Sequence, residues 1–510
     1  MAQNRPQVIS LHPHDDVLVA LKELPAGSRL DAHGLVCRDP IPAGHKVAMR
    51  DIAAGAPVRK YGQIIGFASQ SIPAGGHVHT HNLGFQAFAR DLAPGSEARP
   101  TAYTAPEQRA SFQGYLRADG RAGTRNYLGV LATVNCSASV CRFIAQALPP
   151  ELLAQYPQVD GVVALGHGTG CGGAGVGKLG FTYLQRVLAG YARHPNFAGI
   201  LLVGLGCEGN QVDLLMENME LCEGPLLRAM NIQDQGGTRR TVEQGVARLK
   251  EMLPAANQAR RQTLPASRLL VGLECGGSDA YSGLTANPAL GAAVDILVRQ
   301  GGTAILSETP EIYGAEHLLT RRAASPEAGQ KLAARIQWWE QYAQQNGASL
   351  NNNPSPGNKA GGLTTILEKS LGAVSKGGTT NLVEVYEYAQ PVAAQGLVFM
   401  DTPGYDMVSI TGMVAGGANL VCFTTGRGSV CGSKPAPTLK LATNSEMYRR
   451  MSEDMDINCG AIADGQATVA EMGRGIFELM LAIASGQPSK SEAQGFGDQE
   501  FVPWQIGAVL

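Results

Sequence analysis

Apolar runs that end in glycine-rich loops recur along the chain from about residue 113. Residues 127–134 read Tyr-Leu-Gly-Val-Leu-Ala-Thr-Val, residues 161–165 end in Gly166-His-Gly-Thr-Gly, and residues 200–203 end in Gly204-Leu-Gly-Cys. A helical stretch follows each loop. Continuous apolar runs with helices between them are typical of buried parallel strands, so the pattern predicts an α/β layer architecture.

The same alternation continues to the end of the chain, with runs at residues 269–273, 304–306, 397–400 and 420–423. We therefore expect two α/β units with parallel strands: a catalytic domain over residues 113–385 and a C-terminal domain over residues 386–510.

Residues 9–90 follow a different pattern. The tetrapeptides Leu24-Pro-Ala-Gly, Ile41-Pro-Ala-Gly, Ile52-Ala-Ala-Gly and Ile72-Pro-Ala-Gly each place a glycine before a short extended run. This spacing of turns predicts a small all-β domain. Residues 91–112 carry three prolines and no period, which predicts a linker that lets the β domain move.

Composition narrows the functional classes. The 510 residues carry a formal charge of −2, and 44% of them are hydrophobic, enough for several cores but without the basic excess that nucleic-acid binding needs. No apolar run reaches the roughly 18 residues that span a bilayer, and the first residues lack the apolar core of a signal peptide. We expect a cytoplasmic protein with a small-molecule ligand, no nucleic-acid partner and no membrane partner.

Histidines are concentrated in the predicted β domain, which holds seven of the ten in the chain. On an extended strand, His77, His79 and His81 would share one face. Neutral imidazole is among the commonest ligands of zinc and iron, so this face is a candidate metal site. The alternative is a solvated edge strand.

Cysteines follow four of the predicted strands, where ligands of α/β sheets bind. They are Cys136, Cys171, Cys207 and Cys275. They could hold an iron-sulfur cluster, but none of the compact cluster spacings occurs, so small thiols lining a polar pocket are the favoured interpretation.

Longer motifs carry a family resemblance over nearly the whole chain. They include Gly44-His-Lys-Val-Ala, Gly204-Leu-Gly-Cys-Glu208, Glu274-Cys-Gly-Gly-Ser-Asp279, Asn353-Pro-Ser-Pro-Gly-Asn-Lys359 and Thr425-Gly-Arg-Gly428. In these motifs the chain resembles the altronate dehydratase/galactarate dehydratase family of sugar-acid dehydratases. The resemblance implies an N-terminal β-clip (SAF) domain, a large catalytic region and a divalent metal, iron(II) or manganese(II).

The same resemblance leaves the substrate open. The histidine series is similar to the altronate branch, but the family also contains galactarate dehydratases and a sulfolactate sulfo-lyase. A non-catalytic sugar-acid binding protein is the alternative from another class. An iron-sulfur hydro-lyase is a further one, and a homodimer is the expected assembly.

Dehydration of a 2,3-dihydroxy acid to a 2-keto-3-deoxy acid needs a metal to stabilise the enediolate, a base for the C2 proton and an acid for the departing C3 hydroxyl. A mobile first domain would close this site against water. The candidate metal ligands are His12, Asp15, His77, His79 and His81; the candidate acids and bases are His45, Asp279, Glu308 and Lys359; the candidate substrate-binding residues are Arg125, Asn126, Asn287, Asn358 and Arg427.

Overall fold

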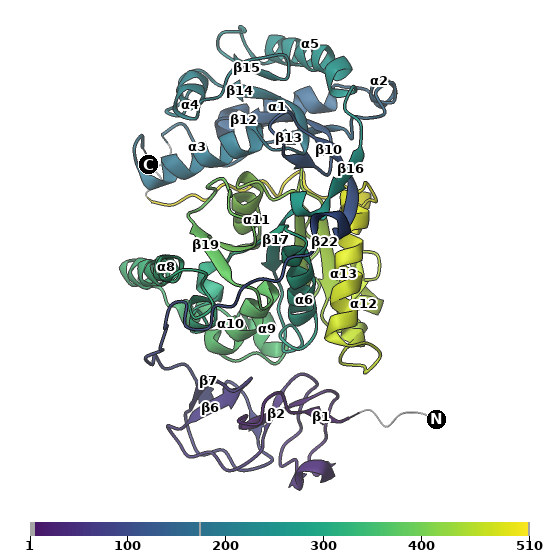
Figure 1. The fold of residues 1–510 in the computed structure, drawn as a ribbon. Helices are drawn as coiled ribbons and strands as arrows, with labels where there is room; N and C mark the ends of the chain where they lie inside the picture. Colours follow the sequence, from purple (N-terminus) through teal and green to yellow (C-terminus); the bar gives the residue numbers. More distant parts are fainter. Residues whose placement is uncertain (1–5, 173–174, 508–510) are drawn as a thin grey trace.

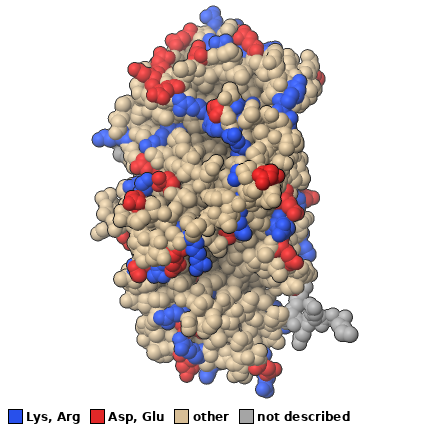
Figure 2. Space-filling model, in the orientation of Figure 1, with Lys and Arg blue, Asp and Glu red and all other residues tan. Residues whose placement is uncertain are grey.

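A computed structural model describes residues 6–172 and 175–507 as three units stacked along one axis. Figure 1 shows the N-terminal domain at one end, a seven-stranded unit in the middle and a four-stranded unit at the other end. The predicted fold class is confirmed, because an all-β domain precedes two units that are each built on a parallel sheet. On the face in Figure 2, basic and acidic side chains are interspersed. No described helix is long and apolar enough to cross a membrane.

The N-terminal domain is built from short antiparallel strands. One sheet has the order β1-β2-β5-β8 and a second has the order β6-β7-β9, with β3 and β4 forming a separate pair. The bounds are β1 Val8–Ile9, β2 Val17–Ala20, β3 Arg29–Leu30, β4 Leu35–Val36, β5 Lys46–Ala48, β6 Pro57–Lys60, β7 Gln63–Ala68, β8 His77–Val78 and β9 Leu83–Gly84.

The repeated tetrapeptides pair with one another in this domain. Leu24 bridges Ile41, and Ile52 bridges Ile72, with all four side chains buried. Each tetrapeptide ends in a glycine with φ between 80° and 84°, a conformation that L residues with a side chain rarely adopt. The repeat therefore has a structural reason, because each copy supplies one core residue and one tight turn.

The segment expected to be a linker lies along the seven-stranded unit. Its backbone N–H groups donate hydrogen bonds from Gly95 to Thr320, from Glu97 to Arg321 and from Thr104 to Arg299. It ends in β10 (Ser111–Leu116), which joins β11 (Ala122–Gly123) and β16 (Gln262–Pro265) in a small antiparallel sheet. The segment is thus attached at several points along its length.

The four-stranded unit has the parallel order β13-β12-β14-β15. Its strands are β12 Tyr127–Ala132, β13 Val162–Leu165, β14 Phe197–Gly204 and β15 Leu227–Asn231; its helices are α1 Asn135–Gln146, α2 Pro150–Leu153, α3 Leu179–Ala192, α4 Val212–Asn218 and α5 Thr238–Ala256. Helices α1 and α5 pack on one face of this sheet and form a hydrophobic core with it. Helix α3 packs on the other face, in a core shared with the seven-stranded unit.

The seven-stranded unit has the parallel order β19-β20-β18-β17-β21-β22-β23. The strands are β17 Leu270–Cys275, β18 Thr303–Leu306, β19 Leu382–Tyr386, β20 Leu397–Met400, β21 Leu420–Thr425, β22 Thr438–Ala442 and β23 Ile457–Asn458; the helices are α6 Ala286–Arg299, α7 His317–Thr320, α8 Pro326–Gln345, α9 Pro356–Ala360, α10 Ile366–Val374, α11 Asp406–Ala415, α12 Ser445–Arg450, α13 Val469–Ala484 and α14 Lys490–Ala493.

This sheet crosses the expected domain boundary near residue 386. Strand β19 contains that boundary, and β17 and β18 pair with β21 and β20 from beyond it. Strands before and after the boundary therefore share one hydrogen-bonded sheet. Apolar runs reveal strands but not which strands pair, so the sequence pattern could not show that strands on both sides of residue 386 belong to one sheet.

Candidate functional site

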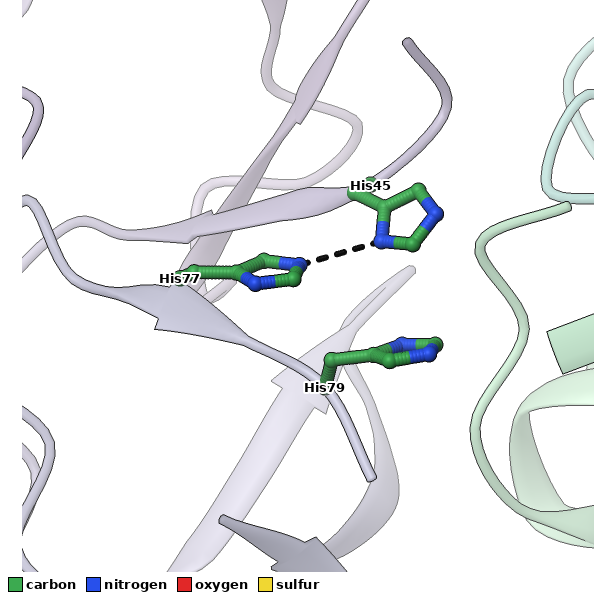
Figure 3. Close-up of side chains that lie close together, drawn as sticks. All are labelled: His45, His77 and His79. Carbon is green, nitrogen blue, oxygen red and sulfur yellow. Dashed lines mark hydrogen bonds between the residues drawn. The ribbon is translucent and has the colours of Figure 1, made fainter. Parts of the chain in front are cut away.

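Three histidines of the N-terminal domain come together on neighbouring strands. His45 directly precedes β5, His77 begins β8, and His79 follows it. Strands β5 and β8 pair antiparallel with Val47 opposite His77, which brings the three side chains together (Figure 3). Nδ1 of His45 lies 3.0 Å from Nε2 of His77, and ring nitrogens of all three histidines lie within 4.8 Å of one another.

The surroundings of this triad keep the imidazoles neutral. Burial, together with neighbouring histidines and Lys46, lowers the pKa of His77 to about 4 and that of His79 to about 3; burial also lowers the pKa of His45. The buried Nδ1 of His79 has no hydrogen-bond partner among the described residues. Metal–nitrogen bonds of about 2.1 Å at tetrahedral or octahedral angles separate two donors by about 3.0 to 3.4 Å. The triad therefore fits a divalent metal in protonation state, and its His45–His77 pair already has the separation of two ligands on one ion.

The triad faces the seven-stranded unit across the domain interface. Nε2 of His45 lies 3.4 Å from the carbonyl oxygen of Ala360, the last residue of α9. Next to His45, the ammonium of Lys46 donates to the Gly362 carbonyl at 2.7 Å and to Glu368 on α10 at 2.9 and 3.0 Å. The imidazoles are thus held against a defined segment of the larger body.

Glu368 joins the two domains through a buried ion-pair cluster. Lys60 donates to Glu368 at 2.9 Å, alongside Lys46, and all three side chains are at most 1% exposed. Burial opposes ionisation of this carboxyl, but the two ammonium groups outweigh it and hold the pKa of Glu368 below its usual value.

Asp279 fixes two glycine loops beside the triad. Asp279 packs so closely against Gly426 and Gly361 that neither position has room for a side chain. A Cβ atom at Gly426 would lie 2.2 Å from Cγ of Asp279, and one at Gly361 would lie 2.9 Å from Cβ of Asp279. Its carboxylate accepts hydrogen bonds from Ser282, Thr443 and Asn444, while burial raises its pKa. A carboxylate with so many partners positions the loops around it.

Two predicted site residues extend from these loops. Lys359 is half-buried on α9 and immediately precedes Ala360, the residue that His45 meets. Arg427 is exposed, and its backbone N–H donates to Gly277 at 2.8 Å. Both residues flank the loops that Asp279 holds together, so the structure brings His45, His77, His79, Asp279, Lys359 and Arg427 into one region.

Other candidate residues lie outside this region or are used within the protein. His81 is exposed, with its ring centroid 5.3 Å from that of His77. Asp15 accepts hydrogen bonds from the backbone of His12 and Gly62 and so stabilises a turn. His12 contacts that turn and does not join the three clustered rings.

The four predicted substrate-binding residues other than Arg427 have their polar groups engaged. Arg125 pairs with Glu492 at 2.7 and 2.8 Å, and Asn126 donates to two carbonyl groups of the four-stranded unit. Asn287 bonds to Gly372 and Thr424. Asn358 accepts from the backbone N–H of Ser355, the N-cap residue of α9, and donates to Ser278. Arg125 and Asn126 precede β12, whose sheet lies at the opposite end of the molecule from the N-terminal domain (Figure 1).

A second group of ionisable side chains is buried at the carboxyl ends of β17 and β18. Lys376 donates to Glu308 at 2.7 Å and lies 2.9 Å from Sγ of Cys275. Glu308 has φ 65°, an uncommon conformation for a residue with a side chain. The group is completed by Glu274, Glu311, Lys369 and Asp406.

Two carboxyl groups of this cluster are shifted toward their protonated form. Burial, the charge of Glu308 and a hydrogen bond with Glu308 raise the pKa of Glu274 well above its usual value. Burial and the neighbouring carboxylates raise the pKa of Asp406 to about 7. Such perturbed carboxyl groups are common at functional sites, and two sets here have the spacing of cation ligands, Cys275 with Glu308 and Glu311, and Glu274 with Glu308 and Asp406.

Cys275 lies in a different unit from the other three cysteines that were candidates for an iron-sulfur cluster. It belongs to β17 of the seven-stranded sheet, whereas Cys136, Cys171 and Cys207 follow strands of the four-stranded sheet. Because the strands belong to different sheets, the four thiols do not converge on one iron-sulfur cluster.

Comparison with known proteins identifies the family. The SAF domain of altronate/galactarate dehydratases matches residues 6–86, the second domain of D-galactarate dehydratase/altronate hydrolase matches residues 114–257, and the C-terminal domain of D-galactarate/altronate dehydratase matches residues 266–509. The altronate dehydratase of Bacillus subtilis is 36% identical over 509 residues, covering 98% of this chain and 99% of that protein. The chain belongs to the altronate/galactarate dehydratase family.

Two Escherichia coli relatives agree with this membership. The galactarate dehydratase (L-threo-forming) is 38% identical and covers 94% of this chain and 93% of its own length. The altronate dehydratase is 35% identical and covers 99% of this chain and 100% of its own length. The chain is therefore a sugar-acid dehydratase by family, and a lyase by class.

Sequence reasoning missed the buried charges of this dehydratase. Lys46 and Lys60 lie within the short apolar runs of the first domain, where a charged residue is a signal for a buried partner. Glu368, Lys369 and Lys376 lie in a helical region that carries no motif, so no signal identified them.

Proposed function

We propose that this dehydratase converts an altronate-type hexonate to a 2-keto-3-deoxy acid, with iron(II) or manganese(II) held by His45, His77 and His79. The observation that carries the proposal is the set of three neutral imidazoles that face α9 across the domain interface. The full-length similarity to two altronate dehydratases supports the choice of substrate.

The chemistry requires charge stabilisation next to an unacidic carbon. When bound, a divalent cation supplies a Lewis acid that stabilises the enediolate formed as C2 loses its proton. Lys359, which precedes the Ala360 carbonyl that His45 meets, is proposed to accept the C2 proton and return one to the departing C3 hydroxyl, which leaves as water. The resulting enol becomes the ketone without a redox change.

We assign substrate binding to Arg427, on the second of the two glycine loops that pack against Asp279. Arg427 is exposed between two glycines, so its guanidinium can form paired hydrogen bonds with a carboxylate. Asp279 acts as a positioning residue, because its carboxylate is already engaged by the residues that hold both loops. A small cavity lined by Tyr61, Asp279, Glu368 and Lys369 lies where the two domains meet. We propose that closure of the first domain over this region excludes water.

Galactarate is the second candidate substrate. It is favoured by the galactarate dehydratase of Escherichia coli, which is similar over nearly the whole chain. Both acids present a carboxylate next to a hydroxyl-bearing carbon, so the same residues would serve either reaction.

The homodimer expected from the sequence stays a prediction.

The test is a substrate panel assayed under reducing conditions with iron(II) or manganese(II). Altronate, galactarate and sulfolactate are supplied separately, and 2-keto product and released sulfite are measured. We expect the 2-keto-3-deoxy acid from altronate, and loss of this product on chelation. Turnover of galactarate alone would show that galactarate, not altronate, is the substrate, and release of sulfite would identify a sulfolactate sulfo-lyase. Binding without turnover would indicate a binding protein.

A further inference from the structure

Three thiols lie at the carboxyl edge of the four-stranded sheet. Figure 1 shows this sheet at the other end of the molecule from the N-terminal domain. Cys136 is the second residue of α1 after β12, Cys171 follows β13, and Cys207 follows β14. Strand β12 pairs with both β13 and β14, so its thiol has one neighbouring cysteine loop on each side. All three residues are exposed, and none of them is joined in a disulfide.

Hydrogen bonds hold the three loops together. The backbone N–H of Asn135 donates to Thr169 at 2.9 Å, and that of Gly209 donates to the carbonyl of Cys171 at 2.9 Å. Between Cys207 and Gly209, the buried Glu208 carboxylate accepts from Thr133 at 2.7 Å and from two N–H groups of its own loop. The positions of the thiols are therefore fixed by the surrounding backbone.

The spacing of two thiols matches one kind of ligand. Sγ of Cys136 and Sγ of Cys171 are 3.9 Å apart. Two thiolates bound tetrahedrally to one metal, with bonds of about 2.3 Å, would be about 3.8 Å apart, whereas the sulfurs of a disulfide are about 2.05 Å apart. The two sulfurs already have the separation of metal ligands.

Cys136 and Cys171 are close enough to affect each other electrostatically. Cys136 lies in the first turn of α1. The Cys136 thiol beside it, with smaller contributions from burial, Cys207 and Glu208, raises the pKa of Cys171. Two thiolates this close repel each other, and a bound cation would remove that repulsion.

We propose that Cys136, Cys171 and Cys207 bind one thiophilic divalent cation of the Zn²⁺ or Fe²⁺ type. Cys207 is the proposed third ligand. Its Sγ accepts a hydrogen bond from Gln233 at 3.3 Å, and because the three sulfurs do not all lie within 4.8 Å of one another, the Cys207 side chain would have to leave Gln233 and move toward the pair to reach the metal. Exposure of the three thiols leaves a fourth position open to water or an exogenous ligand. The site is separate from the histidine triad and uses none of its residues.

The test uses Co²⁺ as a spectroscopic probe of the full-length, reduced and metal-free protein. Thiolate ligation gives charge-transfer absorption in the near ultraviolet, which imidazole and carboxylate ligands do not give. We expect one equivalent of Co²⁺ with this absorption, lost in Cys136→Ser and Cys171→Ser and weakened in Cys207→Ser. Cys222→Ser is the matched control, because Cys222 is also exposed in the four-stranded unit; it should keep the absorption.

A second measurement avoids the variants and their folding. Zn²⁺ is added to the reduced wild-type protein, the thiols are alkylated, and the labelled cysteines are identified by peptide mass mapping. We expect Zn²⁺ to protect Cys136 and Cys171, whereas Cys222 is alkylated throughout. The proposal is overturned if the absorption survives the Cys136→Ser and Cys171→Ser substitutions, or if Zn²⁺ protects neither thiol. It is also overturned if peroxide joins the pair as a disulfide while the reduced pair binds no metal. None of these readouts depends on turnover, so they are independent of the proposed dehydratase reaction.

Discussion

The ammonium group of Lys46 lies 2.9 and 3.0 Å from the two carboxylate oxygens of Glu368, although 322 residues separate them in the chain. Both side chains are fully buried between the first domain and α10. Because Lys46 follows His45, this ion pair also sets the position of the histidine triad against the larger body.

Replacement of Glu368 should destabilise the protein strongly. Glu368→Gln leaves Lys46 and Lys60 buried without a counter-charge, so we expect the free energy of unfolding to fall by about 3 to 5 kcal/mol. Urea unfolding measures the change. Glu384→Gln is the control, because Glu384 pairs with Lys331 on the surface, where such pairs contribute at most about 1 kcal/mol. Equal effects of the two substitutions would contradict the role given to Glu368.

Removal of one imidazole should remove one metal ion without unfolding the protein. In His79→Ala the buried Nδ1 donor is lost, so we expect about one equivalent less metal by elemental analysis, no dehydration and an unchanged Tm. His33→Ala, at an exposed position of the same domain, should behave as wild type. Full activity of the His79→Ala variant would exclude His79 as a ligand.

Lys359 should affect the rate more than substrate affinity. A residue that transfers protons typically contributes about 10² to 10⁴-fold, so Lys359→Met should lower kcat by that factor with a small change in KM. Steady-state kinetics separate the two parameters. Lys250→Met, on the exposed side of α5, controls for loss of a surface charge. A change confined to KM would make Lys359 a binding residue.

Arg427 should affect substrate affinity more than the rate. Loss of a charge-assisted hydrogen bond to a carboxylate costs about 1.5 to 3 kcal/mol, so Arg427→Gln should lower kcat/KM by about 10- to 150-fold, mainly through KM. The variant should fold normally because the side chain is exposed. Arg239→Gln is the control, since the Arg239 side chain is 90% exposed. Unchanged kinetics in Arg427→Gln would remove it from the site.

The buried His194 should make the stability depend on pH. Burial lowers its pKa from 6.5 to about 3, so the folded protein keeps this imidazole neutral while the unfolded chain protonates it below pH 6.5. The unfolded state then binds the extra proton, and the free energy of unfolding falls as the pH falls from 6.5 toward 3, by up to about 1.4 kcal/mol per pH unit.

The variant His194→Gln isolates this contribution. It should be less stable than wild type at pH 7.5, because the hydrogen bond to Ala418 changes, and the difference should narrow as the pH is lowered. Urea unfolding at a series of pH values measures it, with the exposed His33→Gln as a control. A difference independent of pH would show that His194 does not titrate with unfolding.

Several features of the fold could be predicted because they depend on local pattern. The apolar runs identified the parallel strands, and the four tetrapeptides identified the turns of the β domain, since both reflect what a few adjacent residues can bury or bend. The spacing of the histidines predicted that His77, His79 and His81 share one face of a strand. The strand β8 ends at Val78, and the turn that follows leaves the His79 ring stacked on that of His77 and His81 exposed. His45 joined His77 and His79 only through the pairing of β5 with β8.

By itself, the sequence determined the family, the strand-and-turn periodicity and the clustering of histidines in the first domain, because these are properties of neighbouring residues and of motifs along the chain. Only the tertiary structure decided that Glu368 meets Lys46, that Arg125 pairs with Glu492, and that Cys275 lies apart from the other three thiols. Those relationships join residues far apart in the chain, and the pairing of strands and the docking of domains bring them together.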